Sequence, residues 1–264
     1  RTVSMAITDE CDFRCAYCYV NLKNNYLSRK DILSYARQLD DLGTLELALG
    51  GGEPTLYPEL PELCKEIWNT TQLGISVTTH GHRLSEEVVN ALKDYVSIIR
   101  ISVDGPEPVY SKLRGHSLTE LIPKVKKLSS KIPFGLNAVV NKLSIKYLDD
   151  LKTLFIDVGA SELLLLPMKV KSKFSLTHGE WERLADWINL NYKDIPIRIP
   201  VEAQHFLNVP RLFDEPYLND ELDYAFIGVD KTFRPNSFSR DGLKIEDFHS
   251  LKDLIIYRRQ IGGR

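Results

Sequence analysis

Cysteine is scarce in this sequence, and net charge is nearly absent. Only four of the 264 residues are cysteines, and three of them lie within eight residues, from Cys11 to Cys18. This distribution excludes the paired-cysteine framework of small secreted domains. With 34 Lys and Arg against 36 Asp and Glu, the formal net charge is −2. Such a balance offers no electrostatic attraction to a nucleic acid or an anionic membrane, and we expect neither as a partner.

Long apolar runs are missing as well. No stretch approaches the ~20 apolar residues that a membrane-spanning helix needs, and the first residues, Arg1–Met5, do not form a signal peptide. Hydrophobic residues make up 43% and charged residues 27%, which is typical of a globular protein with a substantial core. We therefore expect a cytoplasmic protein.

The chain instead alternates short β-branched runs with longer amphipathic runs. The runs that predict strands are Val3–Thr8, Thr44–Leu49, Gly74–Thr79, Val96–Val103, Pro133–Val140 and Glu162–Leu166. The runs that predict helices are Ser28–Leu42, Tyr57–Thr70, Ser85–Lys93, Ser117–Ser130, Ser144–Val158 and Thr177–Tyr192. Ser28, Ser85 and Thr177 are expected to cap their helices.

Six strand–helix units define the predicted fold class. The strands are nearly continuous Val, Ile and Leu runs, as expected when both faces of a parallel sheet are buried. Right-handed crossovers place the helices outside the sheet, and six units are fewer than the eight of a closed barrel. The sequence therefore predicts an α/β fold, a partial (β/α)6 TIM-like barrel over residues 1–192. Functional groups are expected at the carboxyl ends of its strands.

The pattern changes after residue 192. A strand is predicted at Ile195–Val201, a hairpin from Ala225–Val229 and Thr232–Arg234, and a final helix at Ile245–Arg259. We interpret residues 193–264 as a small C-terminal α+β extension that covers the open side of the barrel.

The cysteine cluster carries the clearest chemistry. Cys11, Cys15 and Cys18 follow the first predicted strand directly. Three thiolates on one short loop can bind three corners of an iron–sulfur cluster and leave one iron open for a substrate or cofactor. A structural zinc site is the alternative, but zinc takes a fourth ligand and no other Cys or His is close in sequence. Cys64, inside a predicted helix, is expected to be an ordinary buried residue.

The spacing C-x-x-x-C-x-aromatic-C after the first strand of a partial barrel resembles the radical S-adenosylmethionine (radical SAM) enzymes. The resemblance implies a [4Fe-4S] cluster whose open iron binds S-adenosylmethionine (SAM). Electron transfer then cleaves SAM to methionine and a 5′-deoxyadenosyl radical, which abstracts a hydrogen atom from the substrate. It also implies an electron donor such as flavodoxin or ferredoxin.

The turns after the second and third strands agree with this resemblance. Gly51, Gly52 and Glu53 form part of a G-G-E-P element, which the family uses to bind SAM. Glycine permits close backbone approach, and a carboxylate accepts hydrogen bonds from an ammonium group. Thr79 belongs to the T-T-H-G turn and is a further cofactor-binding candidate. The family often has T-N-G here, so His80 is a departure, and we interpret it as a neutral loop histidine.

The stretch from Ile101 to Gly115, S-x-D-G-P followed by Leu-Arg-Gly, resembles the peptide- and protein-modifying branch of the family. By this resemblance Ser102 and Asp104 are candidates near the SAM ribose, and Arg114 is a candidate for its carboxylate. Without the resemblance, Asp104 would be an ordinary turn residue and Arg114 a surface charge.

Residues near the ends of the fifth and sixth strands complete the candidate site. In relatives, backbone after the sixth strand meets adenine beside the aromatic residue of the cysteine loop, which places Leu166, Met168 and Tyr17 there. Asn137 and Asn141 flank the end of the fifth strand. They can line the substrate cavity or serve as turn and capping residues.

Many relatives carry a cysteine-rich extension, called SPASM or twitch, that holds additional clusters. The segment Gly228–Ser237 has a similar hairpin outline, but no cysteine follows Cys64. The resemblance therefore implies a degenerate twitch-like extension without metal. Acid–base help can come from Asp104, Tyr224, Asp230 or His205, and the sequence does not choose among them.

The leading hypothesis is a radical SAM enzyme with one [4Fe-4S] cluster, acting on a peptide or on a residue of a ribosomally made peptide. One alternative is a mutase, dehydratase or cyclase acting on a small molecule such as a nucleoside or sugar. An alternative of another class is a non-catalytic protein that binds an iron–sulfur cluster or zinc.

Overall fold

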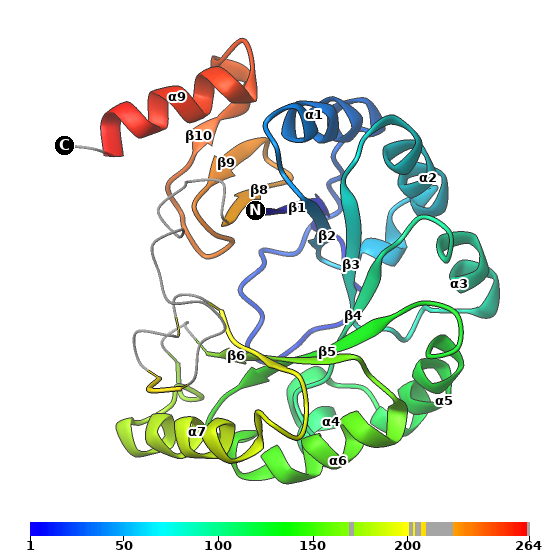
Figure 1. Ribbon diagram of the computed structural model, residues 1–264, viewed down its shortest axis with the longest axis vertical. Helices are drawn as coiled ribbons and strands as arrows, with labels where there is room; N and C mark the ends of the chain where they lie inside the picture. The colour runs from blue at the N-terminus through cyan, green and yellow to red at the C-terminus, as the bar shows by residue number, and fades with distance from the viewer. Residues whose placement is uncertain (169–171, 201–202, 204–206, 210–223, 263–264) are drawn as a thin grey trace.

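The protein forms a curved sheet with helices along its outer face (Figure 1). The computed structural model describes residues 1–168, 172–200, 203, 207–209 and 224–262. No helix in these ranges is both long and apolar enough to cross a membrane.

The central strands are parallel and follow one another in chain order. They are β1 (Thr2–Thr8), β2 (Glu46–Gly51), β3 (Gly74–Thr79), β4 (Ile98–Ser102), β5 (Phe134–Val140) and β6 (Glu162–Pro167). Each pairs in parallel with its neighbour. All six strands predicted from the sequence are present, and the predicted partial TIM-like barrel is confirmed.

A helix follows each of these strands. These helices are α1 (Arg29–Asp41), α2 (Leu60–Thr70), α3 (Glu86–Leu92), α5 (Leu118–Leu128), α6 (Leu148–Val158) and α7 (His178–Asn191). Ser28 and Ser85 accept hydrogen bonds from the first turns of their helices, and Thr177 forms a capping box with Glu180. The three predicted caps are therefore confirmed.

Two helix predictions in the barrel need correction, and one barrel helix was not predicted. The helix expected from Tyr57 begins at Leu60, because a 3₁₀ turn, Pro54–Leu56, precedes it and Tyr57 is extended. The helix expected from Ser144 divides into a 3₁₀ turn, Ile145–Tyr147, and α6. The chain also forms a short helix that the sequence analysis missed, α4 (Val109–Arg114), which ends at Gly115 with φ +77°.

The C-terminal part continues the sheet on both sides. The strand predicted at Ile195–Val201 is only β7 (Ile197–Arg198) in the described residues, and it pairs with β6. The predicted hairpin is confirmed as β8 (Tyr224–Ile227) and β9 (Thr232–Arg234). β8 pairs in parallel with β1, so the hairpin extends the sheet beyond its first strand.

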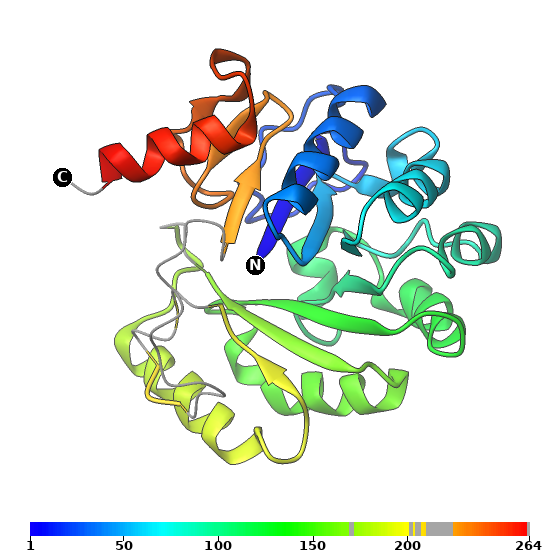
Figure 2. The same ribbon diagram turned by 45° about the horizontal axis from the view of Figure 1, so that its top comes forward.

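The remaining C-terminal elements lie beside α1 (Figure 2). β10 (Leu243–Lys244) pairs with β9, and the strand order is β10-β9-β8-β1-β2-β3-β4-β5-β6-β7. The final helix, α9 (Leu251–Gly262), starts later than predicted because Ile245–Asp247 is a separate 3₁₀ turn. The Leu251 N–H donates to Gln38 of α1 at 2.8 Å.

Strand alternation separates the core from the concave face of the sheet. On β5, Leu136 and Ala138 are buried in the apolar core. Asn137 therefore points to the opposite, concave face, since side chains alternate along a strand. On β4, Ser102 lies in register with Asn137 and shares this face. The carboxyl ends of the strands thus bring these polar groups to the concave side.

Candidate functional site

The loop after β1 carries the three clustered cysteines. Cys11 and Cys15 are half-buried, Cys18 is exposed, and all three thiols are free. The loop is fastened at its centre by a hydrogen bond from the Ala16 N–H to the Leu113 carbonyl of α4, at 2.7 Å. The thiols are therefore presented by a segment whose backbone is tied to the barrel.

The surroundings of Cys11 and Cys15 favour the neutral form of these two thiols. Burial raises the pKa of Cys11 to about 11, although the Phe13 N–H donates to its sulfur at 3.4 Å. Burial also raises the pKa of Cys15, against the lowering effect of the nearby Arg114 charge. Binding of iron must therefore displace protons from these sulfurs.

The donor set fits an iron–sulfur cluster better than a single metal ion. Among the described residues, no three His, Cys, Asp or Glu side chains converge on one ion position. A structural zinc site requires such convergence. A cubane cluster instead places each thiolate on a different iron, so three thiols spread along one partly exposed loop suit it.

Gly51, the last residue of β2, and Gly52 are required by the backbone that leads into the cysteine loop. Gly51 has φ +125°, and a Cβ there would lie 2.0 Å from the Thr8 carbonyl oxygen. A Cβ on Gly52 would lie 2.0 Å from the carbonyl oxygen of Glu10. The sequence analysis explained both glycines by approach to a ligand. The structure shows a different primary reason, which is backbone contact with the segment that leads to Cys11.

Glu53 is a buried carboxylate, 1% exposed, with an ordered set of donors. Its Oε1 accepts from the Thr55 N–H at 3.1 Å, the Thr55 hydroxyl at 2.6 Å and the Thr79 hydroxyl at 2.5 Å. Its Oε2 accepts from the backbone N–H of His80 at 2.9 Å. Thr79, predicted to bind cofactor, therefore holds Glu53 in place in this structure.

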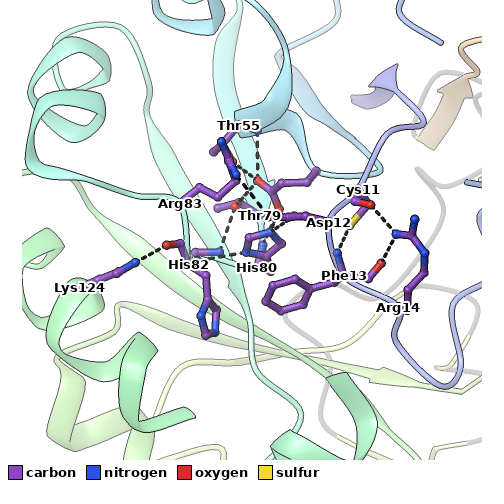
Figure 3. A network of polar contacts seen from close by, with 12 residues as sticks. Cys11, Asp12, Phe13, Arg14, Thr55, Thr79, His80, His82, Arg83 and Lys124 are labelled. Carbon is purple, nitrogen blue, oxygen red and sulfur yellow. Dashed lines mark hydrogen bonds and ion pairs between the residues drawn. The ribbon is translucent and has the colours of Figure 1, made fainter. Parts of the chain in front are cut away.

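His80 lies in the loop directly after β3 and is buried. It is 4% exposed, and its Nε2 lies 2.9 Å from Asp12 Oδ1 and 3.3 Å from Glu53 Oε2. Figure 3 shows the ring between the cysteine loop and the end of β3. Asp12 and Phe13 belong to the same group of contacts and were not predicted as site residues. The only sequence signal was the departure of His80 from the asparagine common in relatives.

A second network lies at the end of β4. Arg114 donates to Asp104 through Nε at 2.8 Å and Nη2 at 3.0 Å, and the Val139 N–H adds a bond at 2.9 Å. The Tyr17 hydroxyl of the cysteine loop donates to the same carboxylate at 2.5 Å. Burial, with the Asp104 charge, raises the pKa of Tyr17 well above its usual value. Tyr17, Asp104 and Arg114, each predicted to lie at SAM, are thus joined by hydrogen bonds to the Asp104 carboxylate.

Arg114, predicted to bind the SAM carboxylate, pairs with Asp104 through Nε and Nη2 in this structure. The side chains of Arg114 and Asp104 are 8% and 0% exposed, respectively. Asp104 accepts four hydrogen bonds, two from Arg114 and one each from Tyr17 and the Val139 N–H. The direct effect of the pair is to fix Tyr17, and with it the loop between Cys15 and Cys18.

Among the remaining candidate residues, Ser102, Asn137 and Leu166 lie on the concave face of the sheet. Ser102 and Asn137 are neighbours there, and Asn137 Oδ1 is buried without a hydrogen-bond partner among the described residues. Leu166, near the end of β6, is half-buried on the concave face, and Met168 is buried just beyond it. Asn141 accepts from the Leu143 N–H at 2.9 Å, which indicates a turn role.

Of the C-terminal acid–base candidates, the structure describes the side-chain contacts of Asp230. Asp230 lies in the hairpin turn, where it accepts from the Thr232 hydroxyl at 2.6 Å and pairs with Arg234. Burial acts to raise the pKa of Asp230, but the hydrogen bond from Thr232 and the charge of Arg234 lower it by more. The pKa of Asp230 therefore lies below its usual value. Tyr224 contributes backbone to β8, and His205 lies outside the described residues. Cys64 is buried in α2, as expected.

Comparisons with known proteins point to one family. The Radical SAM superfamily profile matches residues 5–154. GTP 3′,8-cyclase of Haemophilus influenzae is 30% identical over 155 residues, which are 55% of this chain and 45% of the cyclase. The chain therefore spans less than half the length of that relative.

Solved structures share the fold. SuiB of Streptococcus suis bound to S-adenosylmethionine has a TM-score of 0.80 at 16% identity, covering 96% of this chain and 65% of SuiB. SuiB bound to its precursor peptide SuiA has a TM-score of 0.78 at 17% identity, covering 96% and 64%. Together with the profile match over more than half of the chain, the cysteine loop and the G-G-E-P turn lead to one conclusion: this chain belongs to the Radical SAM superfamily, whose enzymes use a [4Fe-4S] cluster and SAM.

Proposed function

We propose that this chain is a radical SAM enzyme with a single [4Fe-4S] cluster bound by Cys11, Cys15 and Cys18. The observation that carries the proposal is the loop of three free thiols fastened to the turn that presents Glu53. When bound, the cluster and SAM supply reductive cleavage of SAM and a 5′-deoxyadenosyl radical that takes hydrogen from a substrate.

The residues of the chain bind and orient SAM in this proposal. Glu53 accepts the methionine ammonium, because Thr55, Thr79 and the His80 N–H hold its carboxylate in one orientation. Gly51 and Gly52 bring the backbone of this turn against the cysteine loop.

In this proposal, residues on and beside the concave face bind the ribose and the adenine of SAM. Ser102 provides a hydroxyl for the ribose, and Leu166, Met168 and Tyr17 form the surface for adenine. Arg114 acts through Asp104, which positions Tyr17. Residues 193–264 are proposed to be a twitch-like extension without metal, because no cysteine occurs after Cys64 in this sequence.

We favour a peptide as the substrate. The S-x-D-G-P stretch at Ser102–Pro106 supports this choice, as does the likeness over 96% of the chain to SuiB, a protein solved with a precursor peptide. A nucleotide is the second candidate, supported by 30% identity to GTP 3′,8-cyclase over 155 residues. A donor such as flavodoxin or ferredoxin and a cytoplasmic location complete the proposal.

The test is anaerobic reconstitution with iron and sulfide, followed by measurement of 5′-deoxyadenosine formed from SAM and dithionite. Peptides and GTP are added in separate reactions. We expect about four irons per chain and cleavage that needs all three cysteines. The matched control is Cys64→Ala, which removes a buried thiol remote from the loop. Cleavage by Cys15→Ala, or a colourless protein with one bound zinc, would contradict the proposal.

A further inference from the structure

Phe13, at the centre of the cysteine loop, lies between two histidine rings. The His80 ring stacks on one face at 3.9 Å between centroids with an interplanar angle of 2°. The His116 ring stacks on the other face at 3.6 Å and 6°. Phe13 is buried and stands two residues from both Cys11 and Cys15. The stack therefore fastens the middle of the ligand loop to the end of β3 and to the turn after α4.

The polar edge of His80 points to a second connection. The backbone N–H of His82 donates to His80 Nδ1 at 3.0 Å, so Nδ1 is the acceptor and the ring proton is assigned to Nε2. His80 Nε2 bonds to Asp12 Oδ1 at 2.9 Å (Figure 3). It also lies 3.3 Å from Glu53 Oε2, which accepts from the His80 backbone N–H at 2.9 Å. One buried donor thus stands between a carboxylate beside Cys11 and the carboxylate of the G-G-E-P turn.

The other hydrogen-bond partners of Asp12 and Glu53 do not connect these two carboxylates to each other. Arg83 lies 3.4 Å from Asp12, but both of these side chains are more than 40% exposed. Glu53 receives its other bonds from Thr55, Thr79 and the backbone of His80. None of these groups bonds to the cysteine loop. Among the described residues that donate to the Glu53 carboxylate, His80 is the one that also bonds to Asp12, through its backbone N–H and its ring respectively.

We propose that His80 is a positioning residue that sets the cysteine loop relative to Glu53, by stacking on Phe13 and by bridging Asp12 to Glu53. The placement of the cluster ligands and that of the SAM ammonium site are then linked through one residue, whose ring bonds to Asp12 and whose backbone N–H bonds to Glu53. The inference rests on the proposed function only in assigning SAM to Glu53. The contact with Asp12 uses the His80 ring nitrogen, whereas the contact with Phe13 uses the ring face. Different substitutions of His80 can therefore remove one contact and keep the other.

Two substitutions separate these contributions. His80→Phe keeps a ring against Phe13 and removes the donor, whereas His80→Gln keeps a donor and removes the ring. Since a hydrogen bond to a charged group is lost, we expect His80→Phe to raise the Kd for SAM about tenfold. His80→Gln should recover SAM affinity but release iron to a chelator about tenfold faster. His178→Phe, at a side chain 92% exposed on α7, is the matched control.

The decisive measurement is a double-mutant cycle on SAM affinity, read from the SAM-dependent change in the electron paramagnetic resonance spectrum of the reduced cluster. Asp12→Ala is made alone and with His80→Phe. Asp12 is 41% exposed, so this variant is expected to fold. If His80 acts through Asp12, the double variant binds SAM no more weakly than His80→Phe alone. Additive losses, or a His80→Phe variant with unchanged SAM affinity, would overturn the bridge.

The chelator assay keeps the inference testable if the proposed function fails. Failure of the wild-type protein to bind SAM would refute the SAM assignment of Glu53. Iron release from Phe13→Leu and His80→Gln still reports on the stack, because that measurement needs no SAM. Release rates equal to those of the wild-type protein in both variants would refute positioning by the stack.

Discussion

The buried pair of Arg114 and Asp104 allows a quantitative test of what Arg114 does. The Arg114 side chain is 8% exposed and gives two of its donors to Asp104, whose side chain is 0% exposed. Asp104→Asn removes the negative charge with little change in shape and leaves Arg114 charged and buried. Breaking a buried pair in this way costs about 3–5 kcal/mol.

The opposite substitution is expected to cost less. Arg114→Met leaves Asp104 with two donors, the Tyr17 hydroxyl and the Val139 N–H, so the remaining charge is partly compensated. The double variant Asp104→Asn/Arg114→Met leaves no buried charge. It should be no less stable than Asp104→Asn alone, because the large penalty belongs to the unpaired guanidinium.

Urea unfolding of the metal-free protein, followed by circular dichroism, measures these costs. With a slope of about 3 kcal/mol per molar urea, Asp104→Asn should lower the midpoint by about 1 M or more. Arg198→Met, at a side chain 57% exposed that pairs with Glu162, is the matched surface control. Its cost should stay below about 1 kcal/mol.

Additive losses in the free energy of unfolding would refute this reasoning. If the double variant loses the sum of the two single losses, Asp104 does not compensate the Arg114 charge in the folded protein. The guanidinium would then be available to a ligand, as the family resemblance implied. A non-additive result supports its role in fixing Tyr17.

Further predictions concern the glycine turn, the thiols and the carboxylate. Gly51→Ala should lower Tm and iron content, because the new Cβ would lie 2.0 Å from the Thr8 carbonyl oxygen. Gly50→Ala is the control: a Cβ there has no atom within 4 Å, so Tm and iron content should stay unchanged. Iron affinity, measured by chelator competition, should rise from pH 7 to pH 9, since the pKa of Cys11 is about 11 and metal must displace its proton; a flat profile contradicts this. Thr79→Val removes a 2.5 Å hydrogen bond to Glu53 and should weaken SAM binding about tenfold without loss of iron; unchanged SAM affinity contradicts it.

The sequence alone determined the repeating part of this protein. Strand and helix periods are local properties, and so are caps such as Ser28, because a side chain reaches a backbone N–H three residues away. The cysteine spacing and the G-G-E-P turn are also contiguous. These patterns predicted the six barrel units and the family.

Only the tertiary structure decided which groups meet across units. The stack of Phe13 between His80 and His116, and the bonds of Glu53 to Thr79, join segments that are far apart in the chain. Their contacts depend on strand register and on how the turns project from the sheet, and no local pattern records either. The same reason explains why Arg114 was expected at a ligand but lies against Asp104, and why β8 pairs with β1.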